Sequence, residues 1–162
     1  MDYRYGAGDK YNGPKLFGKN TFENLGVNLL LNVGSGRPYT READPAVFGG
    51  NNTIGEFNGS RLPWTNRVDL RIDKDFSLSK KSDALYLNAY IMFQNLFNTG
   101  NVIGVYSYSQ SAEDDGYLAS AEGQQALIAN GSGYEELYRL RLINQNLYTL
   151  PRRIRLGVIF IF

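Results

Sequence analysis

The chain contains neither cysteine nor histidine among its 162 residues. Without cysteine there are no disulfides, thiol nucleophiles or thiolate metal ligands, and without histidine there are no imidazole bases and the commonest zinc ligand is missing. No hydroxyl nucleophile therefore has a histidine to activate it. The acids between residues 69 and 75 alternate along the chain with arginines, which favours mutual neutralisation over paired-carboxylate hydrolysis. We expect neither an enzyme nor a cofactor.

Long apolar runs and an excess of one charge are also missing. The longest apolar runs, such as 158–162, fall far short of the ~20 residues that a membrane-spanning helix needs. The 17 basic and 16 acidic residues leave a formal net charge of +1, which gives no electrostatic basis for nucleic-acid binding. Met1 is not followed by the charged and apolar regions of a secretory signal peptide. Proline is scarce at 5 residues, whereas 12 tyrosines, 9 phenylalanines and 18 glycines indicate β structure with long turns.

Four segments alternate apolar and polar residues over the length of a strand. A β-strand points successive side chains to opposite faces, so such alternation gives each strand one apolar face. The pattern predicts strands at about 22–34, 66–78, 84–94 and 152–162. Each is long enough to cross a bilayer as a tilted strand, which takes about 9–11 residues. Residues 1–20 are interpreted as a strand stub and a periplasmic turn.

The faces opposite the apolar ones are polar and charged. Alternation of this kind fits a barrel wall, with lipid on one side and a water-filled or plugged lumen on the other. A soluble antiparallel sheet alternates in the same way and is the alternative. The residues expected to face the lumen are Arg67, Asp69, Arg71, Asp73, Tyr86, Asn88, Tyr90, Arg153 and Arg155. Ile159 and Ile161 make this face of the last strand unusually apolar, so we expect something to pack there. Lys74 interrupts the apolar face of 66–78 near its end, where its ammonium can reach the headgroups.

The connections between the predicted strands are strongly unequal. A short polar turn, 79–83, joins the second and third strands, whereas 35–65 and 95–151 are long. Short periplasmic turns and long outer loops are typical of outer-membrane barrels. Helical segments are predicted at 117–130 and 134–147. The fold class predicted is therefore all-β, an antiparallel transmembrane β-barrel segment with long extracellular loops containing short helices.

The long loops hold the candidates for ligand contact. Loop aromatics often contact substrates, although packing of the loops against themselves is the favoured alternative. The candidates are Tyr39, Trp64, Tyr106, Tyr108 and Tyr117. Asp114 and Asp115 are candidates for calcium, but glycine after two aspartates is an ordinary turn, so no metal is expected. Gly34 and Gly36 lack the third glycine of a nucleotide-binding turn and predict a tight bend.

Several motifs follow one another in order along the chain. They are residues 34–40, GSGRPYT; 66–74, NRVDLRIDK; 94–98, QNLFN; and the terminal strand. The terminal strand has the spacing polar-x-Gly-x-x-aromatic-x-aromatic at Arg155, Gly157, Phe160 and Phe162. This spacing resembles the signal by which barrel proteins are passed to the outer-membrane barrel-assembly machinery. The whole succession resembles the C-terminal end of TonB-dependent outer-membrane receptors, in particular those with a carboxypeptidase-regulatory-like N-terminal domain.

The resemblance implies a 22-stranded barrel with a plugged lumen in the outer membrane of a Gram-negative bacterium. Such receptors import a scarce nutrient with energy passed from the inner membrane. The implied partners are outer-membrane lipid, the remaining barrel strands and plug domain, the barrel-assembly machinery, TonB through an N-terminal part absent from this chain, and a surface lipoprotein lid. Nucleic acid is not among them.

Four strands cannot close a barrel, since the smallest common barrels use about eight. We therefore expect this chain to carry the closing strands, two outer loops and the assembly signal, with its natural start upstream. Two other functions stay open. One is a structural or passive β-barrel element of a multi-chain outer-membrane assembly, and the other is a soluble glycan-binding β-sandwich.

Overall fold

The computed structural model describes residues 1–49, 52–78 and 85–162. The chain is mostly β, with 36% strand and 21% helix, and contains an antiparallel sheet and two α-helices. It divides into two compact units, which are described separately. Unit 1 comprises Met1–Asn32, Arg67–Thr99 and Pro151–Phe162, and unit 2 comprises Val33–Asn66 and Gly100–Leu150.

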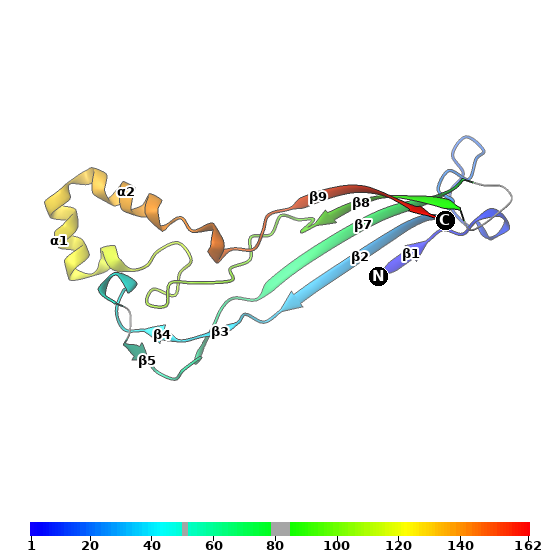
Figure 1. The fold of residues 1–162 in the computed structure, drawn as a ribbon. Coiled ribbons are helices and arrows are strands. Elements are labelled where there is room, and N and C mark those ends of the chain that lie inside the picture. Colours follow the sequence, from blue (N-terminus) through cyan, green and yellow to red (C-terminus); the bar gives the residue numbers. More distant parts are fainter. Residues whose placement is uncertain (50–51, 79–84) are drawn as a thin grey trace. The chain divides into compact units, whose positions relative to one another are not determined.

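Unit 1 is built on a five-stranded sheet in the order β1-β2-β7-β8-β9 (Figure 1). The strands are β1 (Asp2–Arg4), β2 (Leu25–Gly34), β7 (Thr65–Ser77), β8 (Tyr86–Gln94) and β9 (Arg153–Ile161). The four longer strands differ from the predicted ones by at most three residues at any end. The predicted turn at 79–83 lies outside the described residues.

The sheet is open over the part of the chain that the structure describes. Strands β1 and β9 are its two edges, and each is paired along one side only. No closed barrel is present in these residues, and the 22-stranded barrel is not seen. None of the described helices is long and apolar enough to cross a membrane.

Strand pairing aligns residues of neighbouring strands on each face of the sheet. On one face Ile72 of β7 pairs with Ile91 of β8, which pairs with Leu156 of β9. On the other, Asp75 pairs with Asn88, which pairs with Ile159. We call these the apolar face and the polar face of the sheet. They arise because every strand alternates with period two and the antiparallel pairing keeps the alternation in phase.

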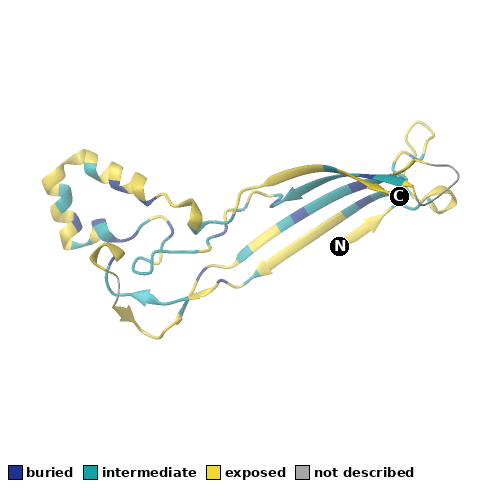
Figure 2. Cartoon of the chain, in the orientation of Figure 1, coloured by how far each residue is buried: buried dark blue, intermediate teal, exposed yellow. Residues whose placement is uncertain are grey.

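Burial in unit 1 is inverted relative to a water-soluble sheet. Among the described residues, the buried hydrophobic side chains all lie in unit 2: Leu62, Ala112, Leu118, Tyr138 and Leu142. The buried side chains of unit 1 are instead polar: Asp69, Asp73, Asn88 and Asn95. On the apolar face, Leu31, Leu156 and Phe160 are 64%, 78% and 65% exposed. Figure 2 shows exposed residues along much of β2 and β9.

Unit 2 is formed by the two segments that were predicted as long loops. It contains two small pairs of strands, β3 (Pro38–Tyr39) with β6 (Ser60–Arg61) and β4 (Arg41–Glu42) with β5 (Thr53–Ile54). Such two-residue strands are too short for alternation to reveal. The helices are α1 (Ala121–Asn130) and α2 (Ser132–Leu142), with 3-10 turns η2 (Ala46–Phe48), η3 (Tyr117–Ala119) and η4 (Gln145–Leu147). A further 3-10 turn, η1 (Gly8–Lys10), belongs to unit 1.

The helices begin and end at recognisable residues. The Ser120 hydroxyl accepts the N–H of Gly123 at 3.1 Å and so caps α1. Gly131 separates α1 from α2 with φ +76°, a conformation that glycine adopts without strain. The second predicted helix, 134–147, is replaced by α2 and η4, because the chain turns to extended backbone at Ile143.

Gly36 lies where two stretches of backbone approach each other closely. A Cβ at this position would lie 1.8 Å from the Leu62 carbonyl oxygen and 2.6 Å from that of Pro63. The neighbouring Leu62 N–H donates to the Arg37 carbonyl at 3.0 Å, which holds the two stretches together. Only a residue without a side chain fits between them.

We therefore expect Gly36→Ala to lower the free energy of unfolding by about 2–4 kcal/mol, since rigid backbone must move to admit the methyl group. Gly133→Ala is the control, because no atom lies within 4 Å of its Cβ position in α2. That change should leave stability equal or raise it by up to about 1 kcal/mol. Denaturant unfolding followed by tyrosine fluorescence measures both, and equal effects would contradict the close approach.

Candidate functional site

The polar face carries a chain of paired side chains that begins at the sheet's edge. Arg4 on β1 pairs with Gly26 on β2. Because Gly26 has no side chain, the Arg4 side chain has a path across β2 to β7. A Cβ at Gly26 would lie 2.7 Å from Nη2 of Arg4 and 3.2 Å from Oδ1 of Asp73. Through this path Arg4 donates to Asp75 at 2.7 Å and to Asp73. The ion pairs thus join the first strand of the sheet to the third.

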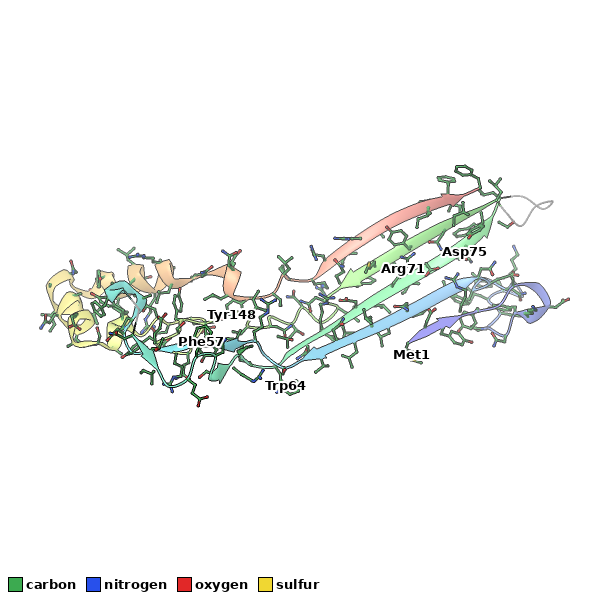
Figure 3. The ribbon with its side chains drawn as sticks, turned by 60° about the horizontal axis from the view of Figure 1, so that its bottom comes forward. Met1, Phe57, Trp64, Arg71, Asp75 and Tyr148 are labelled. Carbon is green, nitrogen blue, oxygen red and sulfur yellow. The ribbon has the colours of Figure 1, made fainter. Side chains whose placement is uncertain are left out.

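Asp73 is the centre of this network. Besides Arg4, it accepts a hydrogen bond from Asn88 Nδ2 at 3.1 Å and lies 3.5 Å from Arg71 Nε. The same Asn88 nitrogen donates to Asp75 at 2.6 Å, and Arg71 Nη2 donates to the side-chain amide oxygen Oδ1 of Asn88 at 3.4 Å. Figure 3 labels Arg71 and Asp75 on this part of the sheet. Only 7% of Asp73 is exposed, and burial of a carboxylate requires such compensation by charge and hydrogen bonds.

Tyr90 extends the contacts to the opposite edge. The Arg71 guanidinium carbon lies 4.4 Å from the centroid of the Tyr90 ring, within cation–π range. Tyr90 pairs with Gly157 on β9, and a Cβ there would lie 2.4–2.5 Å from atoms of the tyrosine ring. Gly157, predicted as part of the assembly signal, therefore also provides the space in which Tyr90 lies.

The other predicted polar-face residues lie on the same face but outside this network. Arg67 forms an ion pair with Asp69 at 3.0 Å, and Asp69 Oδ1 accepts the Asn95 N–H at 2.9 Å. Arg155 and Arg153 are exposed and pair with Met92 and Gln94, and Tyr86 pairs with Ser77 and Ile161. Arg4 was missed by the sequence reasoning, because a three-residue strand gives too little alternation to assign its faces.

A cavity of about 430 Å³ lies over the polar face. Its lining combines the charged network with Ile159 and Ile161, which are 43% and 36% exposed. These two isoleucines are where the sequence suggested that something packs. A partner suited to this surface would contact both paired charges and an apolar patch.

The aromatic candidates of the long loops divide into packed and exposed residues. Tyr106 donates to the Leu142 carbonyl at 3.1 Å, and the Tyr117 ring lies 5.1 Å from that of Tyr138. The Tyr108 ring lies against Gly116, where a Cβ would be 2.6 Å from it. These three side chains pack unit 2, whereas Trp64 is 70% exposed (Figure 3) and Tyr39 lies in the two-residue strand β3.

The two calcium candidates act as acceptors within unit 2. Asp114 accepts the N–H of Gly116 at 2.8 Å. Asp115 is buried, and it accepts the N–H of Tyr117 at 3.0 Å and the hydroxyl of Tyr138 at 2.6 Å. Across the residues with described positions, no three His, Cys, Asp or Glu side chains are grouped to hold a metal ion.

The hydrogen bond between Tyr138 and Asp115 makes unit 2 sensitive to alkali. Burial raises the pKa of Tyr138, and its hydrogen bond to the Asp115 carboxylate raises it further. Below the unfolded-state pKa of about 10 the tyrosine is protonated in both states, so its contribution to stability is complete. As the pH rises above this value, the unfolded chain releases the proton first, and the contribution is lost progressively.

We expect the free energy of unfolding to fall progressively as the pH rises above about 10, and Tyr138→Phe to remove part of this fall. At neutral pH the variant should be about 1–3 kcal/mol less stable, because a buried Asp115 oxygen loses its donor. Denaturant titrations at several pH values, with tyrosinate absorbance as a second signal, measure both effects. Parallel pH profiles for the two proteins would rule out Tyr138 as the source.

No family model matches the chain, and comparisons with curated proteins and with solved structures also found no match. The resemblance to TonB-dependent receptors therefore rests on the chain's own motifs.

Proposed function

We propose that this chain supplies the C-terminal strands of an outer-membrane β-barrel and that the barrel belongs to a TonB-dependent receptor for nutrient uptake. The inverted burial of unit 1 carries the proposal. Its apolar face is exposed on β2 and β9 and half-buried on β8 and most of β7, while its buried side chains are polar and paired. A strand that separates lipid from a polar interior has this distribution.

The strand lengths support the same conclusion. Strands β2, β7, β8 and β9 have 10, 13, 9 and 9 residues, and about 9–11 residues span a bilayer. Lys74, the charge on the apolar face, donates to the carbonyl of Thr21 and lies 5.3 Å from the Phe76 ring centroid. Its ammonium is therefore drawn to the turn that precedes β2, at the strand ends where headgroups would lie.

The edges of the sheet support membership of a larger barrel. A strand edge presents unpaired N–H and C=O groups, which cannot be left unpaired in lipid. Strands upstream would pair with β1 and β2 and close against β9, and a plug domain would contact the polar face around Ile159 and Ile161. The assembly signal Arg155, Gly157, Phe160 and Phe162 would direct insertion, and TonB would act through the N-terminal part.

The two alternatives differ in how many of these observations they explain. A passive barrel element of a multi-chain assembly would share the strands and differ only in lacking a plug and energy coupling. A soluble glycan-binding β-sandwich would bury the apolar face under a second sheet, as packed sheets do. Within the described residues, Leu156, Val158 and Phe160 instead remain more than half exposed.

The first test is the mass and solubility of the native polypeptide that carries this C-terminus. Outer membranes are isolated, washed with alkaline carbonate, extracted with detergent and probed with an antibody to the terminal strand. We expect a detergent-dependent species several times larger than 18.2 kDa. A detergent-dependent 18.2 kDa species would favour the multi-chain element, and a water-soluble one would contradict both barrel proposals.

A further inference from the structure

A second cavity, of about 680 Å³, runs along α2 and the segment that follows it. All of its lining residues belong to unit 2. Cavities of roughly 300–1,000 Å³ are the usual size for small organic ligands. This cavity has no part in the proposed barrel wall, so an inference from it goes beyond the transport proposal and does not depend on it.

One side of the cavity is apolar and open to solvent. Leu140 and Ile143 line it and are 58% and 69% exposed, with Leu142 buried between them in the sequence. The ring of Tyr148, labelled in Figure 3, belongs to the same lining. Covering such exposed apolar surface is favourable by about 25 cal/mol per Å², so a ligand with an apolar group is preferred here.

The charged part of the lining is mainly acidic, with three glutamates and one arginine. Arg139 forms an ion pair with Glu135 at 3.0 Å, one helical turn away, and these two charges neutralise each other. The side chain of Glu136 has neither a hydrogen-bond nor an ion-pair partner among the described residues. Glu113 accepts a hydrogen bond from the Tyr148 hydroxyl at 3.2 Å and forms no ion pair with any residue that the structure describes. The cavity thus presents two uncompensated carboxylates beside an apolar surface.

The Tyr148 hydroxyl is the hydrogen-bond donor to Glu113. Burial raises the pKa of Tyr148, and the hydrogen bond to Glu113 raises it further, so the hydroxyl remains a neutral donor at physiological pH. A hydroxyl donor does not neutralise the carboxylate, which therefore still attracts a cation.

We propose that this cavity binds a short basic peptide with two positive charges and an apolar side chain. The positive charges meet Glu113 and Glu136, and the apolar side chain covers Leu140 and Ile143. A neutral peptide of the same shape satisfies only the apolar part, and an anionic one is repelled. Complementary charge of this kind contributes mainly to specificity.

The test compares two dipeptide amides on the full chain in a nonionic detergent, with isothermal titration calorimetry as the readout. The first is phenylalanyl-arginine amide, which carries two positive charges. The second is acetyl-phenylalanyl-citrulline amide, a neutral peptide of nearly the same shape. We expect the dication to bind at least about tenfold more tightly, and added salt to reduce this preference.

Matched variants locate the site. Glu113→Gln with Glu136→Gln should reduce the preference for the dication to less than about threefold, while retaining an acceptor for Tyr148. Glu122→Gln removes one negative charge from α1, outside the cavity, and should leave the preference unchanged. The near-ultraviolet circular dichroism of the tyrosines checks that each variant is folded.

The proposal is overturned if neither peptide binds, if both bind equally, or if Glu122→Gln has the same effect as the double variant. Membrane insertion is not part of the readout. A water-soluble chain that binds the dication would contradict the transport proposal and support the peptide-binding proposal. A membrane-inserted chain that does not bind the dication would contradict the peptide-binding proposal and leave the transport proposal unaffected.

Discussion

Val158→Arg should sharply reduce the fraction of protein inserted in the outer membrane, whereas Ile159→Arg should have little effect. The two aliphatic residues are adjacent near the middle of β9 and are 57% and 43% exposed. Val158 pairs with Ala89 on the apolar face, and Ile159 pairs with Asn88 on the polar face. Neither belongs to the predicted assembly signal.

The expected difference is large because only one arginine would face lipid. An arginine near the bilayer midplane costs a barrel about 2–4 kcal/mol, whereas one facing the interior is hydrated or paired. At Ile159 it would also lie close to Asp75, which lines the same cavity. The measurement is the detergent-extracted amount of each variant in carbonate-washed outer membranes, relative to the unchanged protein.

The same pair of variants separates the barrel from the soluble sheet. If the apolar face were exposed to water, both arginines would be tolerated and Val158→Arg would improve solubility. If it were covered by a second sheet, Val158→Arg would destabilise the chain in the absence of any membrane. Either result would contradict the proposal that this face contacts lipid.

Asp73→Ala should cause the largest loss of stability among substitutions on the polar face. It removes an acceptor shared by Arg4 and Asn88 and an ion-pair partner of Arg71. Loss of one partner from a buried charge pair costs about 3–5 kcal/mol, and we expect about 2–3 kcal/mol because the Arg4 side chain is 44% exposed and can be hydrated.

Thermal unfolding of the full chain in detergent measures this loss, which corresponds to a decrease in Tm of about 4–12 °C for a chain of this size. Asp75→Ala should cost less, since the Asp75 side chain is 27% exposed and that of Asp73 only 9%. Asp9→Ala removes the same charge from the exposed turn η1 and serves as the control. An effect of Asp73→Ala no larger than that of Asp9→Ala would show that the network contributes nothing to stability.

The sequence was most informative about the long strands. Alternation over nine or more residues, as in β7 and β9, defines both the strand and its two faces, because a shift of one residue would exchange them. It was least informative where structure depends on contacts distant in the chain. The short strands β3 to β6 and the edge strand β1 exist through pairing with partners that no local pattern identifies.

The site residues follow the same division. The face shared by Arg71, Asp73 and Asn88 could be predicted, because each lies on a regular strand. The part played by Arg4 could not, since it requires β1 beside β2 and a glycine at position 26. Likewise, the cavity along α2 depends on Tyr148 and Glu113, which are 35 residues apart and belong to irregular segments.

The path over Gly26 has a consequence for the order in which the sheet folds. Asn88 and Asp75 are 13 residues apart in the chain, whereas Arg4 and Asp75 are 71 apart. Closing the shorter loop loses less chain entropy, so the hairpin of β7 and β8 is expected to form early. Arg4 can reach its carboxylates only after β2 has docked between β1 and β7. The ion pairs of Arg4 therefore form late, and their presence indicates that the N-terminal edge of the sheet has been completed.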